Sequence, residues 1–192
     1  ELRRWLVAEL GGQPRILDCF CGAGMMWRAA YGSTACYVGL DRKQFDDARR
    51  TIVCDSLRYL RHVDARLDDF DLFDLDAYGS PLEHLAIICS RLEPEPGRRL
   101  GFVLTDGTGF AAKMNQSGHG ALSHAGVSRH RATRVQYRYR DTIAEMSIRR
   151  SLAQAGLTVV AAKRAKAPSG GTAEMRYTAI LATWPTARLS RG

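Results

Sequence analysis

Hydrophobic and polar positions along the chain alternate between short apolar runs and the wider spacing of amphipathic helices. The apolar runs predict seven strands, at residues 15–20, 35–41, 51–55, 70–75, 98–106, 157–167 and 175–184. The helical spacing predicts six helices, at residues 2–10, 25–31, 42–50, 56–63, 80–92 and 141–156. Because helices separate most of the strands, we expect parallel βαβ units, with an antiparallel hairpin closed by residues 168–174.

The segment at 80–92 carries the clearest helix signal. Ser80 and Glu83 have the spacing of a capping box, and Pro81 suits the first helical position. Apolar side chains then recur on one helical face, at Leu82, Leu85, Ala86, Cys89 and Leu92. We therefore expect this helix to begin after a short turn that follows the strand at 70–75.

Chain length predicts a single domain that spans residues 1–192, because 192 residues suffice for one sizeable core and no repeat or linker interrupts them. No apolar run is long enough to cross a bilayer, and none at the beginning resembles a signal peptide. We therefore expect a cytoplasmic protein with no membrane partner. The first residue is Glu1 rather than Met, which is compatible with further residues upstream.

The formal net charge is +8, and arginine far outnumbers lysine. Since the guanidinium fork grips phosphate, this balance indicates a polyanionic partner such as nucleic acid, although a GC-rich genome would also favour arginine codons. Part of the charge lies in a long segment without Asp or Glu at about 107–140. Its basic and aromatic side chains are Lys113, Arg129, Arg131, Arg134, Arg138 and Arg140, with Tyr137 and Tyr139.

Five cysteines are present, an odd number without a CxxC pair, so we expect neither a disulfide framework nor a zinc site. We interpret them as small buried side chains in a reducing compartment, with a catalytic thiol at Cys19 or Cys21 as the alternative. The histidines at 119, 124 and 130 have no spacing typical of metal ligands, so no metal is predicted.

A glycine turn, D-C-F-C-G-A-G at 18–24, lies between the first strand and the next helix. Glycine allows the backbone to approach a ligand closely, and an acid about twenty residues later, Asp41, can accept hydrogen bonds from ribose hydroxyls. Asp55 and Ser56 follow the third strand, where an adenine amino group would need an acceptor. The missing third glycine favours a ligand without phosphates. The alternative is that Asp41 and Asp55 only form turns at strand ends.

This order of motifs resembles the class I S-adenosylmethionine-dependent methyltransferases over roughly residues 1 to 184. The resemblance implies a Rossmann-like α/β fold, with a seven-stranded sheet, an antiparallel C-terminal hairpin and helices on both faces. It also implies that S-adenosylmethionine is the cofactor. The cofactor-binding residues that it implies are Asp18, Phe20, Gly22 and Gly24 near the methionine part, Asp41 at the ribose, and Asp55 and Ser56 at the adenine.

The stretch F-D-L-F-D-L-D-A-Y-G-S-P at 70–81 places acids where an apolar strand ends. Ligands of open α/β sheets bind outside the carboxyl ends of the strands, and Asp76 lies nearer that exit than Asp74. The exocyclic amine of a base is a poor nucleophile, and a carboxylate that accepts its N–H can direct the lone pair and stabilise developing positive charge. We therefore predict Asp76 as the catalytic acceptor and Tyr78 as the stacking platform for the base.

The string D-L-D-A-Y-G-S-P is similar to D-x-D-P-[FY]-G-S-P of the tRNA guanine-N2 dimethyltransferases, and V-L-T-D at 103–106 is similar to their T-x-T-D. This resemblance implies substrate contacts at Gly79 and Ser80. Ala77 replaces the proline of that family, which removes a rigid φ angle from the loop. The chain also lacks that family's additional C-terminal domain for tRNA. Amino-methyltransferases of DNA carry a related D-P-P-Y motif, which leaves DNA open as a substrate.

The predicted function is methylation of an exocyclic amine on a nucleic-acid base, with guanine N2 in tRNA or other RNA favoured and a role in tRNA processing. The segment at 107–140 is expected beside Asp76, with phosphate contacts from Arg129, Arg131 and Arg134, unless it is only a solvated loop. The alternatives are DNA amino-methylation, methylation of a protein or small molecule, and a scaffold without catalysis. A partner protein could supply RNA binding.

Overall fold

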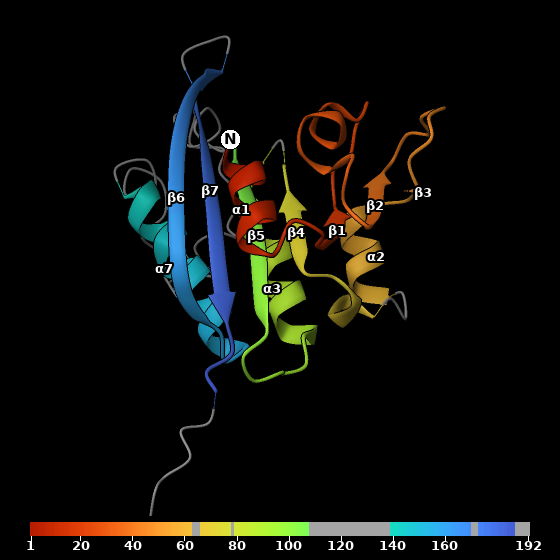
Figure 1. The fold of residues 1–192 in the computed structure, drawn as a ribbon. Helices are drawn as coiled ribbons and strands as arrows, with labels where there is room; N and C mark the ends of the chain where they lie inside the picture. Colours follow the sequence, from red (N-terminus) through yellow and green to blue (C-terminus); the bar gives the residue numbers. More distant parts are fainter. Residues whose placement is uncertain (63–65, 78, 108–138, 170–172, 187–192) are drawn as a thin grey trace, which may run out of the picture.

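A computed structural model describes residues 1–62, 66–77, 79–107, 139–169 and 173–186. Seven strands form one sheet in the order β3-β2-β1-β4-β5-β7-β6 (Figure 1). The predicted Rossmann-like fold class is confirmed by this strand order and by the helices that cover the sheet. The strands are β1 (Arg15–Asp18), β2 (Cys36–Asp41), β3 (Thr51–Val53), β4 (Leu72–Leu75), β5 (Arg99–Asp106), β6 (Thr158–Ser169) and β7 (Ala173–Thr183).

Strands β1 to β5 pair in parallel, and β5 with β7 and β7 with β6 pair antiparallel. This matches the expected change from βαβ units to a closing hairpin. In the register of β1 and β4, Asp18 pairs with Asp74, so the exits of these two neighbouring strands lie side by side. A β-bulge between Val159 and Ala161 interrupts the hairpin register near its base.

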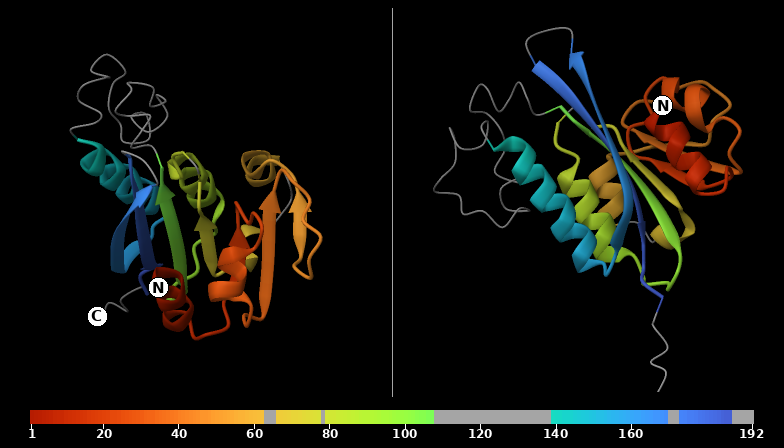
Figure 2. Two further views of the ribbon diagram at one scale, coloured as in Figure 1. Left: turned by 90° about the horizontal axis from the view of Figure 1, so that it is seen from above. Right: turned by 60° about the vertical axis from the view of Figure 1, so that its left-hand side comes forward.

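Helices cover both faces of the sheet (Figure 2). One face carries α1 (Leu2–Glu9) and the π-helical turn η1 (Trp27–Tyr31). The other carries α2 (Ser56–His62), α3 (Leu82–Arg91) and α7 (Arg140–Gln154), and the 3₁₀ turn η2 (Leu67–Asp69) precedes β4. All six predicted helical regions except 42–50 are therefore helical in part or throughout.

Side chains that alternate along the central strands fill a separate core on each face. Ile16 and Leu72 point into the core under α1, whereas Leu17 and Phe73 point into the core under α2, α3 and α7. This period of two explains why the central strands are apolar throughout, because both of their faces are covered. The sheet is thus a rigid support for the loops at its carboxyl edge.

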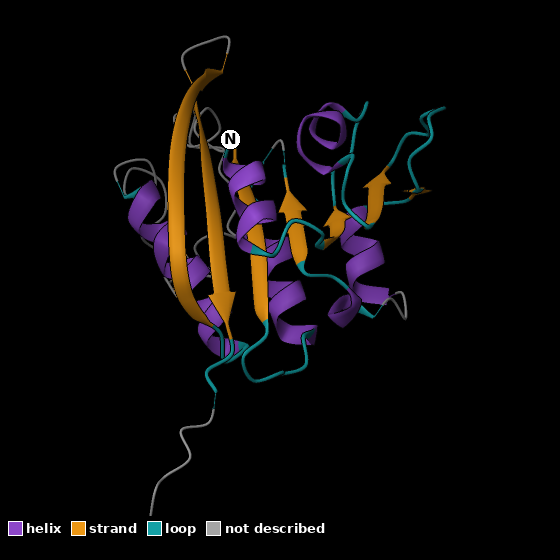
Figure 3. Ribbon diagram, in the orientation of Figure 1, coloured by secondary structure: helices purple, strands orange, loops and turns teal. Residues whose placement is uncertain are grey.

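The predicted helix at 42–50 is wrong, because this segment is a loop between β2 and β3 (Figure 3). Its only large apolar residue is Phe45, so a helix would have no apolar face to bury. The Asp47 carboxylate instead accepts the backbone N–H of Arg49 at 3.1 Å, a local bond that competes with helix formation. The loop turns Arg49 into the interior, where its side chain is buried.

The capping box is formed only in part. Ser80 Oγ accepts the backbone N–H of Leu82 at 3.3 Å, and the residue that caps α3 is Pro81 rather than Ser80. Glu83 forms an ion pair with Arg61 of α2 instead of closing the box. Ion pairing with the neighbouring helix thus replaces the expected bond from Glu83 to the backbone.

All five cysteines are free thiols, of which Cys19, Cys21 and Cys89 are buried and Cys36 and Cys54 partly exposed. Burial raises the pKa of the Cys21 thiol to about 11, which disfavours the thiolate that a nucleophile would need. In the described part of the chain, no three metal-ligating side chains come together and no helix has the length and apolarity of a membrane span.

Candidate functional site

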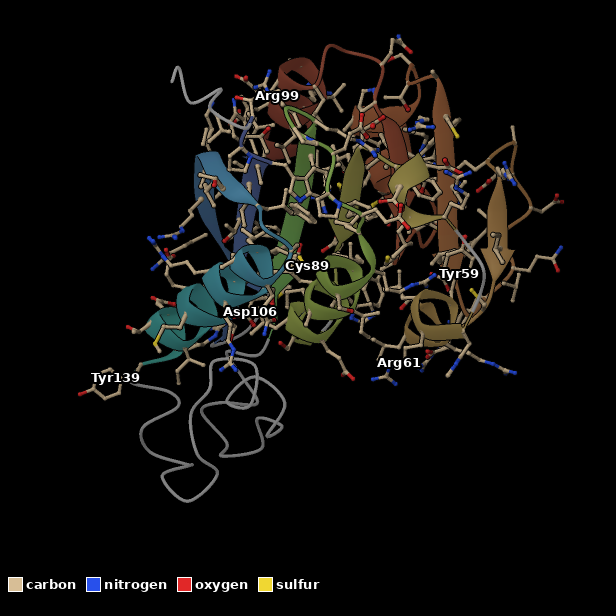
Figure 4. The ribbon with its side chains drawn as sticks, turned by 90° about the horizontal axis from the view of Figure 1, so that it is seen from below. Tyr59, Arg61, Cys89, Arg99, Asp106 and Tyr139 are labelled. Atoms are coloured by element: carbon tan, nitrogen blue, oxygen red, sulfur yellow. The ribbon has the colours of Figure 1, made fainter. Side chains whose placement is uncertain are left out.

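Parallel pairing brings the ends of β1, β2, β4 and β5 to one edge of the sheet. Asp18, Asp41 and Asp106 are the last residues of their strands, and Asp76 follows β4. Figure 4 shows Asp106 and Arg99 at opposite ends of β5, with Tyr139 on the side of Asp106. In open α/β sheets the carboxyl edge is the place where ligands bind.

The glycine turn follows β1 directly and contacts the end of β2. Gly22 and Gly24 have φ angles of +44° and +78°, in the left-handed region that favours glycine. The N–H of Gly22 donates to Asp41 Oδ2 at 3.0 Å, and Asp41 Oδ1 accepts the N–H of Lys43 at 2.9 Å. The structure therefore places the Asp41 carboxylate against the glycine turn, at the end of β2.

Arg49 holds this turn from inside. Its guanidinium donates to the carbonyl oxygens of Cys21 at 3.0 Å and Gly22 at 2.8 Å, and it pairs with Asp47 at 2.5 Å. A Cβ atom at Gly24 would lie 2.7 Å from Arg49 Cζ. Arg49 was not among the predicted site residues, since an arginine in a polar segment gives no sign that it will be buried.

Asp18 is buried and shapes the same turn. Its Oδ1 accepts the N–H of Phe20 at 3.1 Å, and its Oδ2 accepts the hydroxyl of Tyr37 at 2.8 Å. Burial, followed by the nearby charge of Asp74, raises the pKa of Asp18 to about 7. The carboxyl group is thus a structural acceptor for the turn, and its protonation changes near neutral pH.

Asp55 and Ser56 lie at the start of α2, in line with their predicted place. Asp55 forms an ion pair with Arg42 and accepts the N–H of Arg58 at 2.9 Å, and the Arg42 hydrogen bond lowers the pKa of its carboxyl group. Ser56 Oγ lies 2.9 Å from Nε2 of His84, a buried residue of α3.

His84 connects the third-strand exit with the glycine turn. Its ring centroid lies 4.9 Å from that of Phe20, and burial lowers its pKa to about 4, which keeps it neutral at physiological pH. Its Nδ1 atom is buried without a hydrogen-bond partner among the described residues. Phe20, Ser56 and His84 therefore meet from three different elements, and His84 was not among the predicted site residues.

The exit of β4 carries a charged cluster that we call the Arg3 clamp: Arg3, Tyr31, Asp74 and Asp76. Asp74 is fully buried and accepts Arg3 Nε at 2.6 Å, Arg3 Nη2 at 3.1 Å and the Tyr31 hydroxyl at 2.7 Å. Burial raises the pKa of the Asp74 carboxyl group. Arg3 Nη2 also lies 2.9 Å from Asp76 Oδ2, and 32% of the Asp76 side chain is exposed. Asp74 is therefore an interior anchor, and Asp76 is the acid at the edge.

The loops after β4 and β5 are joined to each other. The N–H of Gly107 donates to the carbonyl of Gly79 at 3.1 Å. Arg140, at the start of α7, lies 3.0 Å from Asp106 Oδ2 and donates to the Asp106 carbonyl at 2.9 Å. Both ends of the basic segment at 107–140 are thus fixed at the carboxyl edge, near the exit of β4.

Several predicted residues lie outside the described part of the chain. They are Tyr78, the predicted stacking residue, and the predicted phosphate contacts Arg129, Arg131 and Arg134. Among the remaining predictions, the structure brings together Asp18, Phe20, Gly22, Gly24 and Asp41 around the turn, with Ser56 joined to Phe20 through His84. Gly79 and Ser80 lie between Asp76 and α3.

No known family profile matches the sequence, and no curated protein does. Solved structures match it in three dimensions. The 1,6-didemethyltoxoflavin-N1-methyltransferase of Burkholderia thailandensis, solved with its substrate and S-adenosylhomocysteine, has a TM-score of 0.51 and 15% identity, and the match covers 96% of this chain and 76% of that one. TYW2 of M. jannaschii, in complex with AdoMet, has a TM-score of 0.52 and 8% identity over 95% and 75% of the chains.

An S-adenosylmethionine-dependent methyltransferase of Methanosarcina mazei has a TM-score of 0.54 and 12% identity, with 94% and 97% of the two chains covered. At such identities the likeness concerns the fold. This chain therefore has the Rossmann-like fold of class I methyltransferases, with the antiparallel strands β7 and β6 beside β5.

Proposed function

We propose that this chain is an S-adenosylmethionine-dependent N-methyltransferase that acts on an exocyclic amine of a nucleic-acid base, with guanine N2 in RNA as the favoured target. The observation that carries the proposal is the position of Asp76. Its carboxylate is partly exposed, lies two residues beyond the partner of Asp18 in the β1–β4 register, and is held by Arg3. The proposed acceptor therefore lies next to the proposed cofactor turn.

The residues around the turn suit S-adenosylmethionine. The nearest atom to a Cβ at Gly22 would be 3.9 Å away, so the backbone there is open to close approach, and the Asp41 carboxylate lies at the end of β2, where ribose hydroxyls would meet it. When bound, S-adenosylmethionine supplies an electrophilic methyl group on a sulfonium centre.

In the proposed reaction, Asp76 accepts a hydrogen bond from the amino group that becomes methylated. This bond directs the nitrogen lone pair and stabilises the positive charge that develops on nitrogen. Arg3 fixes the carboxylate through Nη2, and the buried Asp74 fixes Arg3 through two further bonds. The Asp76 carboxylate and the amino group are thus oriented before the reaction. Tyr78 remains the proposed stacking residue for the base.

A nucleic-acid substrate is supported by the net charge of +8 and by the acid-free segment at 107–140, whose ends are fixed beside the β4 exit. RNA is favoured over DNA by the similarity of D-L-D-A-Y-G-S-P to the tRNA guanine-N2 motif. The 1,6-didemethyltoxoflavin-N1-methyltransferase favours a second candidate, a small heterocyclic substrate, because that enzyme shares the fold. A protein partner that adds RNA affinity is compatible with the first proposal.

The test is methyl transfer from labelled S-adenosylmethionine to unmodified tRNA and to DNA in parallel, followed by nucleoside digestion and mass spectrometry. We expect N2-methylguanosine from the RNA. Label in DNA alone would replace RNA by DNA as the substrate. Absence of label in both, with cofactor binding intact, would reject a nucleic-acid substrate and direct the search to small heterocycles.

The variant Asp76→Asn tests the assigned role. Transfer is expected to fall on the order of 10²- to 10³-fold, the cost typical of losing one preorganised group at a developing charge. Cofactor affinity, measured by calorimetry with S-adenosylhomocysteine, should stay unchanged. Glu93→Gln is the matched control, because Glu93 is an exposed acid after α3 and outside the site. Equal activities of the two variants would remove Asp76 from the mechanism.

A further inference from the structure

A cavity of about 760 Å³ lies between α1, η1 and the β6–β7 hairpin. Figure 1 shows α1 in front of β5 and beside the hairpin, on the face opposite to α3 and α7. We call this cavity the α1 groove. The wall residues that matter here are Arg3, Arg4, Met26, Lys163 and Tyr177. Its volume lies within the range of about 300–1,000 Å³ typical of ligand sites.

The walls of the α1 groove carry exposed cations. Arg4 is exposed and uses Nε to donate to the Ala29 carbonyl at 2.8 Å, which fixes the guanidinium beside the groove. The Lys163 ammonium lies 4.6 Å from the ring centroid of Trp5, a contact that positions the group and leaves its charge in place. The acid in the lining is Glu1, whereas Arg164 forms an ion pair with Glu145.

The α1 groove opens next to the proposed catalytic acid. Arg3 lines it, and the Nη2 atom of the same side chain lies 2.9 Å from Asp76 Oδ2. Tyr177 of β7 pairs in register with Thr105, one residue before β5 ends at the carboxyl edge. A ligand in the groove would therefore touch the other side of the arginine that holds Asp76.

We propose that the α1 groove binds the nucleotide next to the target base in a single-stranded stretch of RNA. This inference rests on the proposed function. The half-buried ring of Tyr177 offers a surface on which a base can stack, and Arg4 and Lys163 lie where they can contact the phosphates on either side of it. A single strand is required because the amine must be free of base pairing to be methylated.

A small neutral heterocycle as substrate would leave both cations without a role, whereas a flanking phosphate uses them. The groove would thus supply part of the affinity of this chain for RNA. It lies on the α1 face, whereas the ends of the basic segment at 107–140 are fixed by Gly79 and Asp106. The α1 groove and the basic segment would contact different parts of the same RNA strand.

The test measures binding of a fluorescently labelled, unmodified tRNA stem-loop over a series of salt concentrations. The variants are Arg4→Gln, Lys163→Gln and the double substitution. Each single variant should reduce the magnitude of the slope of log K, the binding constant, against log salt by about 0.7, and the double variant by about twice that amount. The reason is that binding releases fewer counterions when a phosphate contact is lost. Arg66→Gln is the matched control, an exposed arginine before β4 at the opposite edge of the sheet.

Tyr177→Leu tests the stacking surface separately. RNA affinity should fall roughly 5- to 150-fold with an unchanged salt slope, since stacking involves no counterion release. Thermal melting confirms that each variant is folded, and calorimetry with S-adenosylhomocysteine should give unchanged cofactor affinity.

The outcomes separate this inference from the proposed function. Wild-type methylation of RNA together with unchanged slopes in both charge variants would overturn the α1 groove and leave the proposed function standing. A slope that falls equally in Arg66→Gln would also overturn it, because the effect would be long-range. Wild-type protein that neither binds nor methylates RNA would reject the proposed function and the groove together.

Discussion

Two arginines with little exposed side-chain surface, Arg49 at 0% and Arg3 at 11%, hold the two halves of the candidate site by different chemistry. In the cofactor half, Arg49 donates to the backbone carbonyls of Cys21 and Gly22. In the substrate half, Arg3 donates to the carboxylates of Asp74 and Asp76. Neither contact is apparent from sequence spacing, and each arginine belongs to an element different from the one that it fixes.

This difference predicts which kind of substitution destabilises each half of the site. The glycine turn is fixed by backbone conformation, so it should be sensitive to an added Cβ atom and less sensitive to charge. The Arg3 clamp balances one cation against two acids, the buried Asp74 and the partly exposed Asp76, so it should be sensitive to charge. A buried ion pair is costly to break because removing one partner leaves an uncompensated charge.

The largest effect is expected from Arg3→Ala. It leaves the fully buried Asp74 with only the Tyr31 hydroxyl among the contacts described, and the free energy of unfolding should fall by about 3–5 kcal/mol. Urea denaturation measures this loss. Arg99→Ala is the control, because Arg99 also bonds to α1, through Glu9, but both side chains are about 40% exposed. That variant should lose only about 0–1 kcal/mol. Equal losses would mean that the burial of Asp74 does not make its contact with Arg3 more stabilising than the exposed pair of Arg99 and Glu9.

The next effect is expected from alanine in the glycine turn. Gly24→Ala adds the cost of a left-handed φ, roughly 1–2 kcal/mol, to a Cβ contact of 2.7 Å with Arg49 Cζ. In Gly22→Ala the nearest atom is 3.9 Å away, so only the conformational cost remains. Calorimetry with S-adenosylhomocysteine should show the larger loss of affinity for Gly24→Ala.

A double-mutant cycle separates the two costs at Gly24. If contact with Arg49 matters, Gly24→Ala should cost less in an Arg49→Gln background, because the shorter side chain removes the guanidinium from the contact. Equal losses of cofactor affinity in both backgrounds would show that the whole cost of Gly24→Ala comes from the left-handed φ angle. That result would assign Arg49 to the carbonyl contacts and not to the packing of Gly24.

The sequence pattern was sufficient for the sheet and for the strand-end acids, since both depend on local order. Alternating apolar residues mark strands, and an acid directly after a parallel strand must lie at the carboxyl edge. Asp41 at the end of β2 and Asp76 at the β4 exit were predicted in this way. The antiparallel hairpin followed from two long apolar runs around a glycine-rich turn.

The partners of those acids could not be predicted, because they are chosen by packing between distant segments. Arg3 lies 71 residues from Asp74, and Arg49 reaches carbonyls 27 and 28 residues away. His84 lay in a helix whose apolar face was predicted without it. The helix predicted at 42–50 was wrong for a related reason. The burial of Arg49, which depends on contacts with a distant segment, fixes the path of that loop.

A smaller effect is expected from pH, through Asp18, which contacts both halves. Its pKa is raised from 3.8 to about 7, so between these values the folded state binds a proton that the unfolded state does not. Stability from this group is full below pH 3.8 and is lost as pH rises through 7. His84, with a pKa lowered from 6.5 to about 4, acts in the opposite direction, and stability rises with pH between those values.

The measurement is therefore a difference between wild type and Asp18→Asn, by urea denaturation at several pH values. The wild type should lose stability relative to the variant as pH rises from about 4 to 7, and the difference should stay constant at higher pH. A difference that is flat throughout would mean that Asp18 is ionised in the folded protein. In that case neither burial nor the charge of Asp74 would raise the pKa of Asp18.

The smallest effect is expected from Arg61→Ala, which asks whether burial or charge alone makes an arginine contact important. Arg61 and Glu83 form an ion pair between α2 and α3, but both side chains are nearly half exposed. Water and salt screen such a pair, so the free energy of unfolding should change by about 0.2–1 kcal/mol. The change should diminish in high salt, whereas the loss in Arg3→Ala should persist because its carboxylate partner is inaccessible to ions. If Arg61→Ala lowers the free energy of unfolding as much as Arg3→Ala does, burial is not what makes an arginine contact stabilising. The connection between two elements would then explain both losses.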